Sequence, residues 1–106
     1  AFAHASAAGR GGRGAPIVWA AGNGGAKGDD CNYDGYTNSR HTIAVGSVQA
    51  SGVTAPWTEH CHAMLVTTPS GGNTMWSADV SGAWGQSSGD CSERFGSASA
   101  SAAAAA

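Results

Sequence analysis

The sequence predicts an α/β fold with a mostly parallel sheet, and three observations lead to this prediction. Three runs of strand length lie at residues 15–21, 42–48 and 63–68, separated by connectors. The first run, APIVWAA, is apolar at every position, as in a parallel strand that is covered on both faces. Helical signals lie at both ends of the chain. Three strands alone do not cover two faces, so we expect this sheet to be part of a larger one.

The first third of the chain is expected to run from a helix into a strand and then into a polar loop. Residues 1–8 are alanine-rich, and Gly9 follows where a C-terminal glycine ends a helix. After the connector GRGGRG, the strand at 15–21 ends at GNGG. This loop falls at the carboxyl edge of the sheet, where open α/β sheets bind ligands. Asn23 in such a loop is typical of a turn, but a rigid strand before it could also hold its amide for donation to an oxyanion.

Two further strands are predicted from their length and β-branched content, TIAVGSV at 42–48 and AMLVTT at 63–68. Residues 69–90 are expected to be mostly loop, with a short strand around 75–80. The final stretch, FGSASASAAAAA, allows three interpretations. It could be a serine and alanine tail without structure, a tract of stand-in alanines, or a helix with a nucleophile on its first turn.

Composition and charge argue against two classes of partner. The 106 residues include 11% charged residues and carry a formal net charge of -2, without the basic stripe that nucleic-acid binding needs. No apolar run approaches the roughly 18 residues of a membrane span. We therefore expect no nucleic-acid partner and no membrane segment in this chain. The length suits one small domain with a modest core.

The acidic segment DDCNYDG at residues 29–35 could hold a hard cation. It matches the opening of an EF-hand loop, but the twelfth loop position is His41 where the EF-hand requires a bidentate glutamate. An EF-hand is therefore not predicted. A calcium site built from Asp29 and a distant carboxylate remains open, and so does a solvated acidic turn.

The triplet HCH at His60, Cys61 and His62 contains zinc-ligand side chains. On a strand the two imidazoles would share one face while the thiol points to the other, so the three do not easily converge. A disulfide between Cys61 and Cys31 is the simpler interpretation. The chain has three cysteines, and this odd count leaves at least one without an internal partner.

Several of these segments together resemble one family. Residues 9–39 strongly resemble the matching part of the kexin and furin proprotein convertases, calcium-dependent serine endoproteases of the subtilisin class. APWTEHC at 55–61 is similar to the family's aromatic-Ser-Glu-Ala-Cys segment, and CSERFGSASASA at 91–102 to its nucleophile block. The likeness is weakest at 72–90. It implies that residues 1–106 are a partial catalytic domain of the subtilisin-like three-layer fold, with a mostly parallel sheet.

The resemblance implies two catalytic residues. Setting the last serine repeat on the family's Gly-Thr-Ser-Ala-Ser-Ala makes Ser99 the nucleophile at the start of a buried helix. The amides and the positive dipole end of a helix N-terminus favour the charge that develops during acyl transfer. Asn23 corresponds to the oxyanion-hole amide. Because the serines repeat, the register is open, and Ser97 or Ser101 is the competing nucleophile.

The resemblance also implies how a substrate is bound. Trp19, Ala20, Ala21 and Gly22 would form a wall of the cleft and offer backbone groups to an extended peptide. Asp34 corresponds to the acid at the floor of the primary specificity pocket. A buried carboxylate there would pair with an Arg or Lys side chain. The implied substrates are peptides or proproteins that are cleaved after basic residues.

Metal and disulfide assignments follow from the same likeness. Asp29 and Glu59 correspond to ligands of a Ca²⁺ ion near the cleft. Cys31 and Cys61 correspond to a family disulfide, and Cys91 to a half-cystine whose partner lies upstream. Disulfides of this kind imply the secretory pathway or the extracellular space.

The chain departs from the family in ways that limit the expected activity. Subtilisins carry their triad in the order Asp, His, Ser, and the resemblance begins after the Asp and the His. None of the four histidines matches the catalytic base, so we expect this chain alone to be inactive and to need the N-terminal part of the same domain. Ser97, Ala98 and Ala103 replace a glycine, a threonine and a proline of the nucleophile block. A catalytically inactive subtilisin-fold binding or scaffold module is therefore the alternative function.

Overall fold

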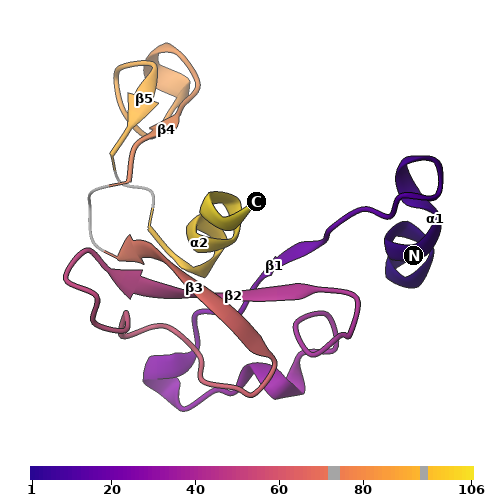
Figure 1. Ribbon diagram of the computed structural model, residues 1–106. Helices are drawn as coiled ribbons and strands as arrows, with labels where there is room; N and C mark the ends of the chain where they lie inside the picture. The colour runs from indigo at the N-terminus through magenta and orange to yellow at the C-terminus, as the bar shows by residue number, and fades with distance from the viewer. Residues whose placement is uncertain (72–74, 94–95) are drawn as a thin grey trace.

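A computed structural model describes residues 1–71, 75–93 and 96–106 of the chain (Figure 1). Its helices, strands and short 3-10 turns follow in this order: α1 (Phe2–Gly12), β1 (Val18–Ala20), η1 (Gly25–Lys27), η2 (Cys31–Tyr33), β2 (Ile43–Gln49), β3 (Met64–Gly71), β4 (Ser77–Ala78), η3 (Gly82–Trp84), β5 (Cys91–Ser92) and α2 (Ala98–Ala105). The strands form a three-stranded sheet and a separate two-stranded pair.

The three-stranded sheet is parallel throughout and has the order β1-β2-β3. Val18 pairs with Ile43 at one junction, and Ala44 pairs with Met64 at the other. Helix α2 packs against all three strands, as Figure 1 shows. The prediction of an α/β fold with a parallel sheet is therefore confirmed.

The core between sheet and helix is built from small side chains. Val45 is its largest apolar member, and Ala44, Ala98 and Ala100 are buried around it. Alanines on the inner side of α2 let the helix approach the strands closely, because no long side chain separates the two layers. Leu65 on β3, in contrast, is 71% exposed.

Strand β1 is shorter and less covered than expected. The apolar run at 15–21 predicted a strand covered on both faces, but only Val18–Ala20 form the strand, and all three are half-buried. Ala21, the residue after the strand, is fully buried. The prediction of full cover was wrong, because the described elements that pack on β1, namely α2 and the Phe2 ring against Trp19, leave all three residues partly exposed.

The predicted N-terminal helix is present, and the regular helix is interrupted at Gly9, the glycine that was expected to end it, although α1 runs to Gly12. Gly9 leaves the helical conformation, and Arg10 and Gly11 that follow have positive φ angles of 54° and 69°. Phe2 holds α1 to the rest of the chain by ring contacts with Trp19 and Tyr36. Neither helix of the described residues has the length and apolar character to cross a bilayer.

Residues 75–93 form a small unit that projects away from the sheet in Figure 1. In its antiparallel pair, Ser77 lies opposite Ser92 and Ala78 opposite Cys91. The expected loop with a short strand is therefore confirmed, and the second strand, β5, is an addition to it. The expected loop was wrong at its start, because residues 69–71 continue β3.

Candidate active site

Helix α2 begins beside the loop that follows β1, and it carries the three candidate nucleophiles in different environments. Ser97 precedes the helix in an extended conformation and is half-buried. Ser99, on the first turn, is exposed, and its hydroxyl has no hydrogen-bond partner among the described residues. Ser101 is fully buried. The C-terminal stretch is thus a helix with one accessible hydroxyl on its first turn.

Asn23 lies against this first turn. Its Oδ1 accepts a hydrogen bond from the backbone N–H of Ala98 at 2.8 Å, although the two residues are 75 positions apart. Because Oδ1 is engaged as the acceptor, the Nδ2 donors of the amide point elsewhere, and no described residue accepts from them. The structure therefore brings together the two residues that the resemblance implied as oxyanion donor and nucleophile.

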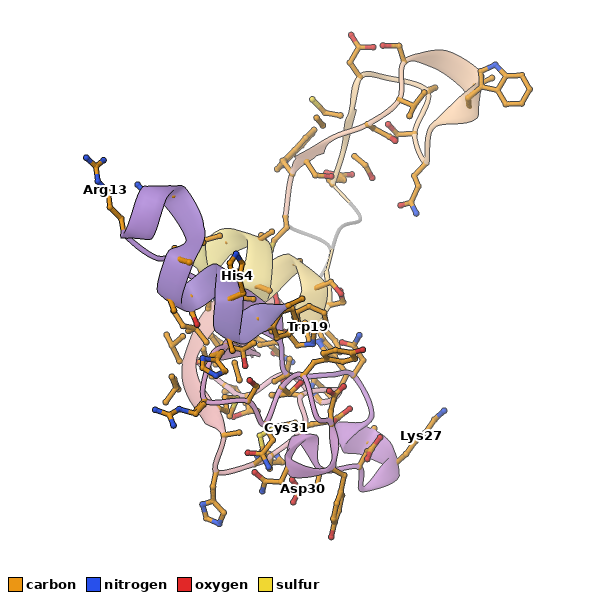
Figure 2. The ribbon with its side chains drawn as sticks, turned by 90° about the vertical axis from the view of Figure 1, so that its right-hand side faces the viewer. His4, Arg13, Trp19, Lys27, Asp30 and Cys31 are labelled. Atoms are coloured by element: carbon orange, nitrogen blue, oxygen red, sulfur yellow. A yellow bond between two sulfur atoms is a disulfide. The ribbon has the colours of Figure 1, made fainter. Side chains whose placement is uncertain are left out.

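An acidic pocket of about 300 Å³ lies beyond the end of β1. Four carboxylates and three uncharged residues line it: Asp29, Asp30, Asp34, Glu59, Ala21, Gly22 and Tyr33. No lysine, arginine or histidine is among these residues, and the side chain of nearby Lys27 extends outward in Figure 2. The pocket therefore favours a cationic group.

Glu59 is the buried carboxylate of this pocket, with 8% of its surface exposed. Its Oε1 accepts from Gly24 N–H at 2.9 Å. Gly22, at φ +112°, also lies against the carboxylate, since a Cβ there would stand 2.8 Å from Glu59 Oε2. These two glycines of the GNGG loop leave the space that Glu59 occupies. Sequence reasoning assigned Gly22 to the cleft wall and missed both contacts.

The carboxylates of Asp29 and Glu59 flank the same backbone position. A Cβ on Gly24 would lie 2.8 Å from Asp29 Oδ2 and 3.0 Å from Glu59 Oε1. A buried carboxylate without a cation is costly, and residues 1–71, 75–93 and 96–106 provide Glu59 with one hydrogen bond and no ion pair. Ca²⁺ accepts oxygens from separate loops. The pair therefore fits a calcium ion that draws further ligands from elsewhere.

The described residues offer no support for the zinc interpretation. His60 and His62 are exposed and precede β3 instead of lying on a strand. Cys61 forms a disulfide with Cys31. In the described part of the chain, Asp30, Cys31 and Cys61 lie close enough together to bind one metal ion. The two sulfurs are bonded to each other in the disulfide and are therefore not available as ligands.

Asp34 lines the acidic pocket but is exposed, so the prediction of a buried carboxylate was wrong. Its Oδ1 accepts from the N–H groups of Tyr36 at 2.7 Å and Thr37 at 3.1 Å, and this holds the side chain in a surface turn. The residues that line the pocket therefore leave this carboxylate open to solvent. Its second oxygen has no partner in this turn.

Several backbone groups of the predicted cleft wall are already paired, because Trp19 and Ala20 lie in the ladder with β2. Ala21 N–H donates to Val45 O at 2.9 Å, and the Thr37 hydroxyl donates to Ala20 O at 3.3 Å. Trp19 is half-buried between Phe2 and the Tyr36 ring, with its ring centre 5.2 Å from that of Tyr36. Figure 2 places Trp19 between α1 and the loops that carry Asp30 and Cys31.

The three cysteines differ in their bonding and in their exposure to solvent. Cys31 is fully buried and is joined to Cys61, so the expected disulfide is present. Cys91 on β5 is an exposed free thiol. This disulfide links the loop after β1 to the segment before β3 and therefore ties the acidic pocket to the sheet.

Comparison with known proteins matches residues 2–106 to the subtilase family. The chain is 41% identical to kexin of Saccharomyces cerevisiae over 96 residues, which is 89% of this chain and 11% of that protein. It is 44% identical to proprotein convertase subtilisin/kexin type 7 of Mus musculus, over 79% of this chain and 11% of that protein. With furin of Mus musculus the identity is 49%, over 69% of this chain and 9% of that protein. The chain thus spans about a tenth of the length of these relatives. Both its sequence and its parallel sheet show that the chain belongs to the subtilase family, among the kexin- and furin-like members.

Proposed function

We propose that this chain is one part of a kexin-like serine endopeptidase that cleaves proproteins after basic residues. The observation that carries the proposal is the hydrogen bond between Ala98 N–H and Asn23 Oδ1, beside the exposed hydroxyl of Ser99. It puts an amide donor next to the start of a helix that presents an accessible serine. The relatives named kexin, furin and proprotein convertase support the same class.

In this proposal Ser99 Oγ attacks the carbonyl carbon of the scissile peptide, and its proton passes to a histidine outside residues 1–106. The family order Asp, His, Ser places that base upstream. The oxyanion accepts hydrogen bonds from Asn23 Nδ2 and from the N–H of Ser99. That N–H precedes the first intrahelical bond, from Ser101 N to Ser97 O, and so has no partner within the helix. Transfer of the proton to the amine releases the leaving peptide and leaves an acyl-enzyme for water to hydrolyse.

Specificity for basic residues is assigned to the acidic pocket. Asp34 has one oxygen held by its turn and the other available to an Arg or Lys side chain. Gly22 lies on the same pocket at the end of the cleft wall. A cationic side chain that enters here meets several carboxylates, so a neutral side chain of the same size is bound more weakly.

Asp29 and Glu59 are proposed to hold Ca²⁺. The ion would neutralise the buried Glu59 and link two loops that line the pocket. The disulfide between Cys31 and Cys61, together with the similarity to kexin and furin, supports a place in the secretory pathway or outside the cell. Residues 1–106 are in this proposal a partial catalytic domain, with the catalytic Asp and His supplied by the part upstream.

A fluorophosphonate probe tests the assignment of the nucleophile. In the protein that carries this chain together with its base, we expect the probe to label Ser99, and S99A to abolish labelling and peptide cleavage. Removing the nucleophile of a subtilisin costs on the order of 10⁶ in turnover. S101A is the control, because the Ser101 hydroxyl is buried. It should keep the label. Labelling at Ser101, or at no serine of α2, would contradict the assignment.

One observation favours a second function, an inactive binding module. Ala98 stands where the family has a threonine, directly before the proposed nucleophile. If the wild-type protein binds a basic peptide but neither reacts with the probe nor cleaves that peptide, the binding module replaces the protease as the function.

A further inference from the structure

Three buried serines meet beneath the first turn of α2. Ser47 on β2, Ser70 on β3 and Ser101 on α2 are each no more than 1% exposed. Ser47 Oγ lies 2.8 Å from both other hydroxyls, and Ser70 and Ser101 are also hydrogen-bonded to each other. We call these three residues the serine cluster. It joins the helix to two strands of the sheet, in a core otherwise built from alanine and valine.

Ser70 is the one member of the cluster whose side chain also reaches the backbone that precedes the helix, and it shares the Ser97 carbonyl with the backbone N–H of Ser101, which donates to it at 3.2 Å. Ser70 Oγ donates to the carbonyl oxygen of Ser97 at 3.0 Å. With Ser70 donating there, Ser101 can donate to Ser70 and Ser47 to Ser101, so every hydroxyl proton has an acceptor. Ser47, in contrast, has no bond to Ser97 or to any residue before Ala98 on this segment.

The Ser97 carbonyl and the Ala98 N–H belong to the same peptide unit. Ser70 on β3 donates a hydrogen bond to the carbonyl oxygen of this peptide unit, and Asn23 in the loop after β1 accepts one from its N–H. A peptide unit is planar, and here it is trans, so the two groups point in opposite directions and fixing one fixes the other. The peptide thus spans the space between β3 and Asn23.

We propose that Ser70 is a positioning residue for the oxyanion hole, acting through the Ser97–Ala98 peptide on the amide of Asn23. This inference rests on the proposed function. The Ser70 hydroxyl fixes the direction of the Ala98 N–H, that N–H fixes the rotation of the Asn23 amide, and the amide then presents Nδ2 toward the carbonyl that Ser99 attacks. Small misplacements of such donors lower turnover more than they lower binding.

The test compares S70A with S47A in the protein that carries this chain together with its catalytic base. Both variants remove one buried hydroxyl from the serine cluster, and S70A removes in addition the bond to the Ser97 carbonyl, which is the bond under test. We expect S70A to lower kcat on the order of tenfold with little change in KM. We expect S47A to stay within about twofold of the wild type, since the Ser97–Ala98 peptide keeps its contact. Equal losses of kcat in the two variants would overturn the proposal.

A double-mutant cycle with N23A separates positioning from a general loss of stability. Because Ser70 acts through Asn23, adding S70A to N23A should lower kcat no further. If the fold losses of kcat in S70A and N23A multiply in the double variant, the inference is overturned. N23A also reports on the proposed function by itself, because removing an oxyanion donor should cost about 10² to 10³ in kcat. If N23A is harmless, the proposed function fails. If N23A is costly and S70A behaves as S47A does, only the role of Ser70 fails.

S70C provides the second variant in case S70A does not fold. A thiol has a similar size and is a weaker donor. We expect kcat of S70C below that of the wild type and KM unchanged. A kcat for S70C equal to that of the wild type would overturn the role of the hydroxyl.

Discussion

The sheet with α2 and the unit at residues 75–93 are held together in different ways. In the first region, contacts join residues that are far apart in the sequence, such as Asn23 with Ala98 and Ser47 with Ser101. In the second region, the hydrogen bonds of Asp79 and Ser87 join residues of the same unit. The proposed chemistry lies in the first region, where segments brought from different parts of the chain fix one another.

The second region depends on one carboxylate. Asp79 accepts hydrogen bonds from Val80 N–H at 2.8 Å and from Ser87 N–H at 2.9 Å. The Ser87 N–H bond is the main reason that the pKa of Asp79 is held below its ordinary value. Trp84, in the same unit, is 91% exposed and adds little buried area. Disrupting Asp79 should therefore have a local effect.

Removing the disulfide should have the largest effect on stability, and only in the first region. Cys31 and Cys61 are 30 positions apart, and a cross-link that closes a loop of this size contributes about 3 to 4 kcal/mol to the free energy of unfolding. We expect the double substitution to serine to lower the free energy of unfolding by about this amount in urea titrations. C91S is the control and should change it by less than about 0.5 kcal/mol, because that thiol is exposed. Similar losses in both variants would remove the distinction between the two regions.

Calcium should stabilise the first region and not the second. With Ca²⁺ at about 100 times its Kd, we expect the free energy of unfolding to rise by about 2.7 kcal/mol. E59Q removes the charge of the buried carboxylate and should abolish this response, measured as the shift of Tm on addition of EGTA. D79N, which alters a carboxylate in the other region, should respond as the wild type does. A full calcium response in E59Q would exclude Glu59 as a ligand.

D79N should have the smallest effect, confined to residues 75–93. We expect faster amide exchange at Ser87 and Val80, because their acceptor is weakened, with the free energy of global unfolding unchanged. Acid should act in the same way. The folded pKa of Asp79 is lowered, so its contribution is present above the unfolded pKa and is lost as the pH falls through the lower folded value.

The control for this pH dependence is D79N itself, whose amide shifts at Ser87 should not titrate in that range. If the amide shifts of the wild type and of D79N follow pH alike, another group is responsible. Loss of stability throughout the sheet in D79N would show that the two regions are coupled.

Sequence reasoning predicted the elements well and the burial of individual side chains less well. The strands at 42–48 and 63–68 carry a local signal, their β-branched content, and both are present. The terminal helix is also present, but the stretch alone allowed three interpretations and the family resemblance was needed to predict it. The predicted burial of β1 and of Asp34 was wrong, because burial depends on which other segments of the chain cover a strand or a surface turn. The bond from Ser70 to Ser97 could not be predicted either. The sequence around a serine on a strand does not indicate to which distant carbonyl its hydroxyl donates.

Ser99 and Ser101 are separated by about 200° around the helix axis, so one contributes its hydroxyl to solvent and the other to the core. Packing therefore places almost no demand on position 99. A descendant of this protein could exchange that serine for alanine and keep its shape, its disulfide and its acidic pocket. If Ser99 is the nucleophile as proposed, one substitution at a position that packing does not constrain separates a protease from a module that only binds its peptide.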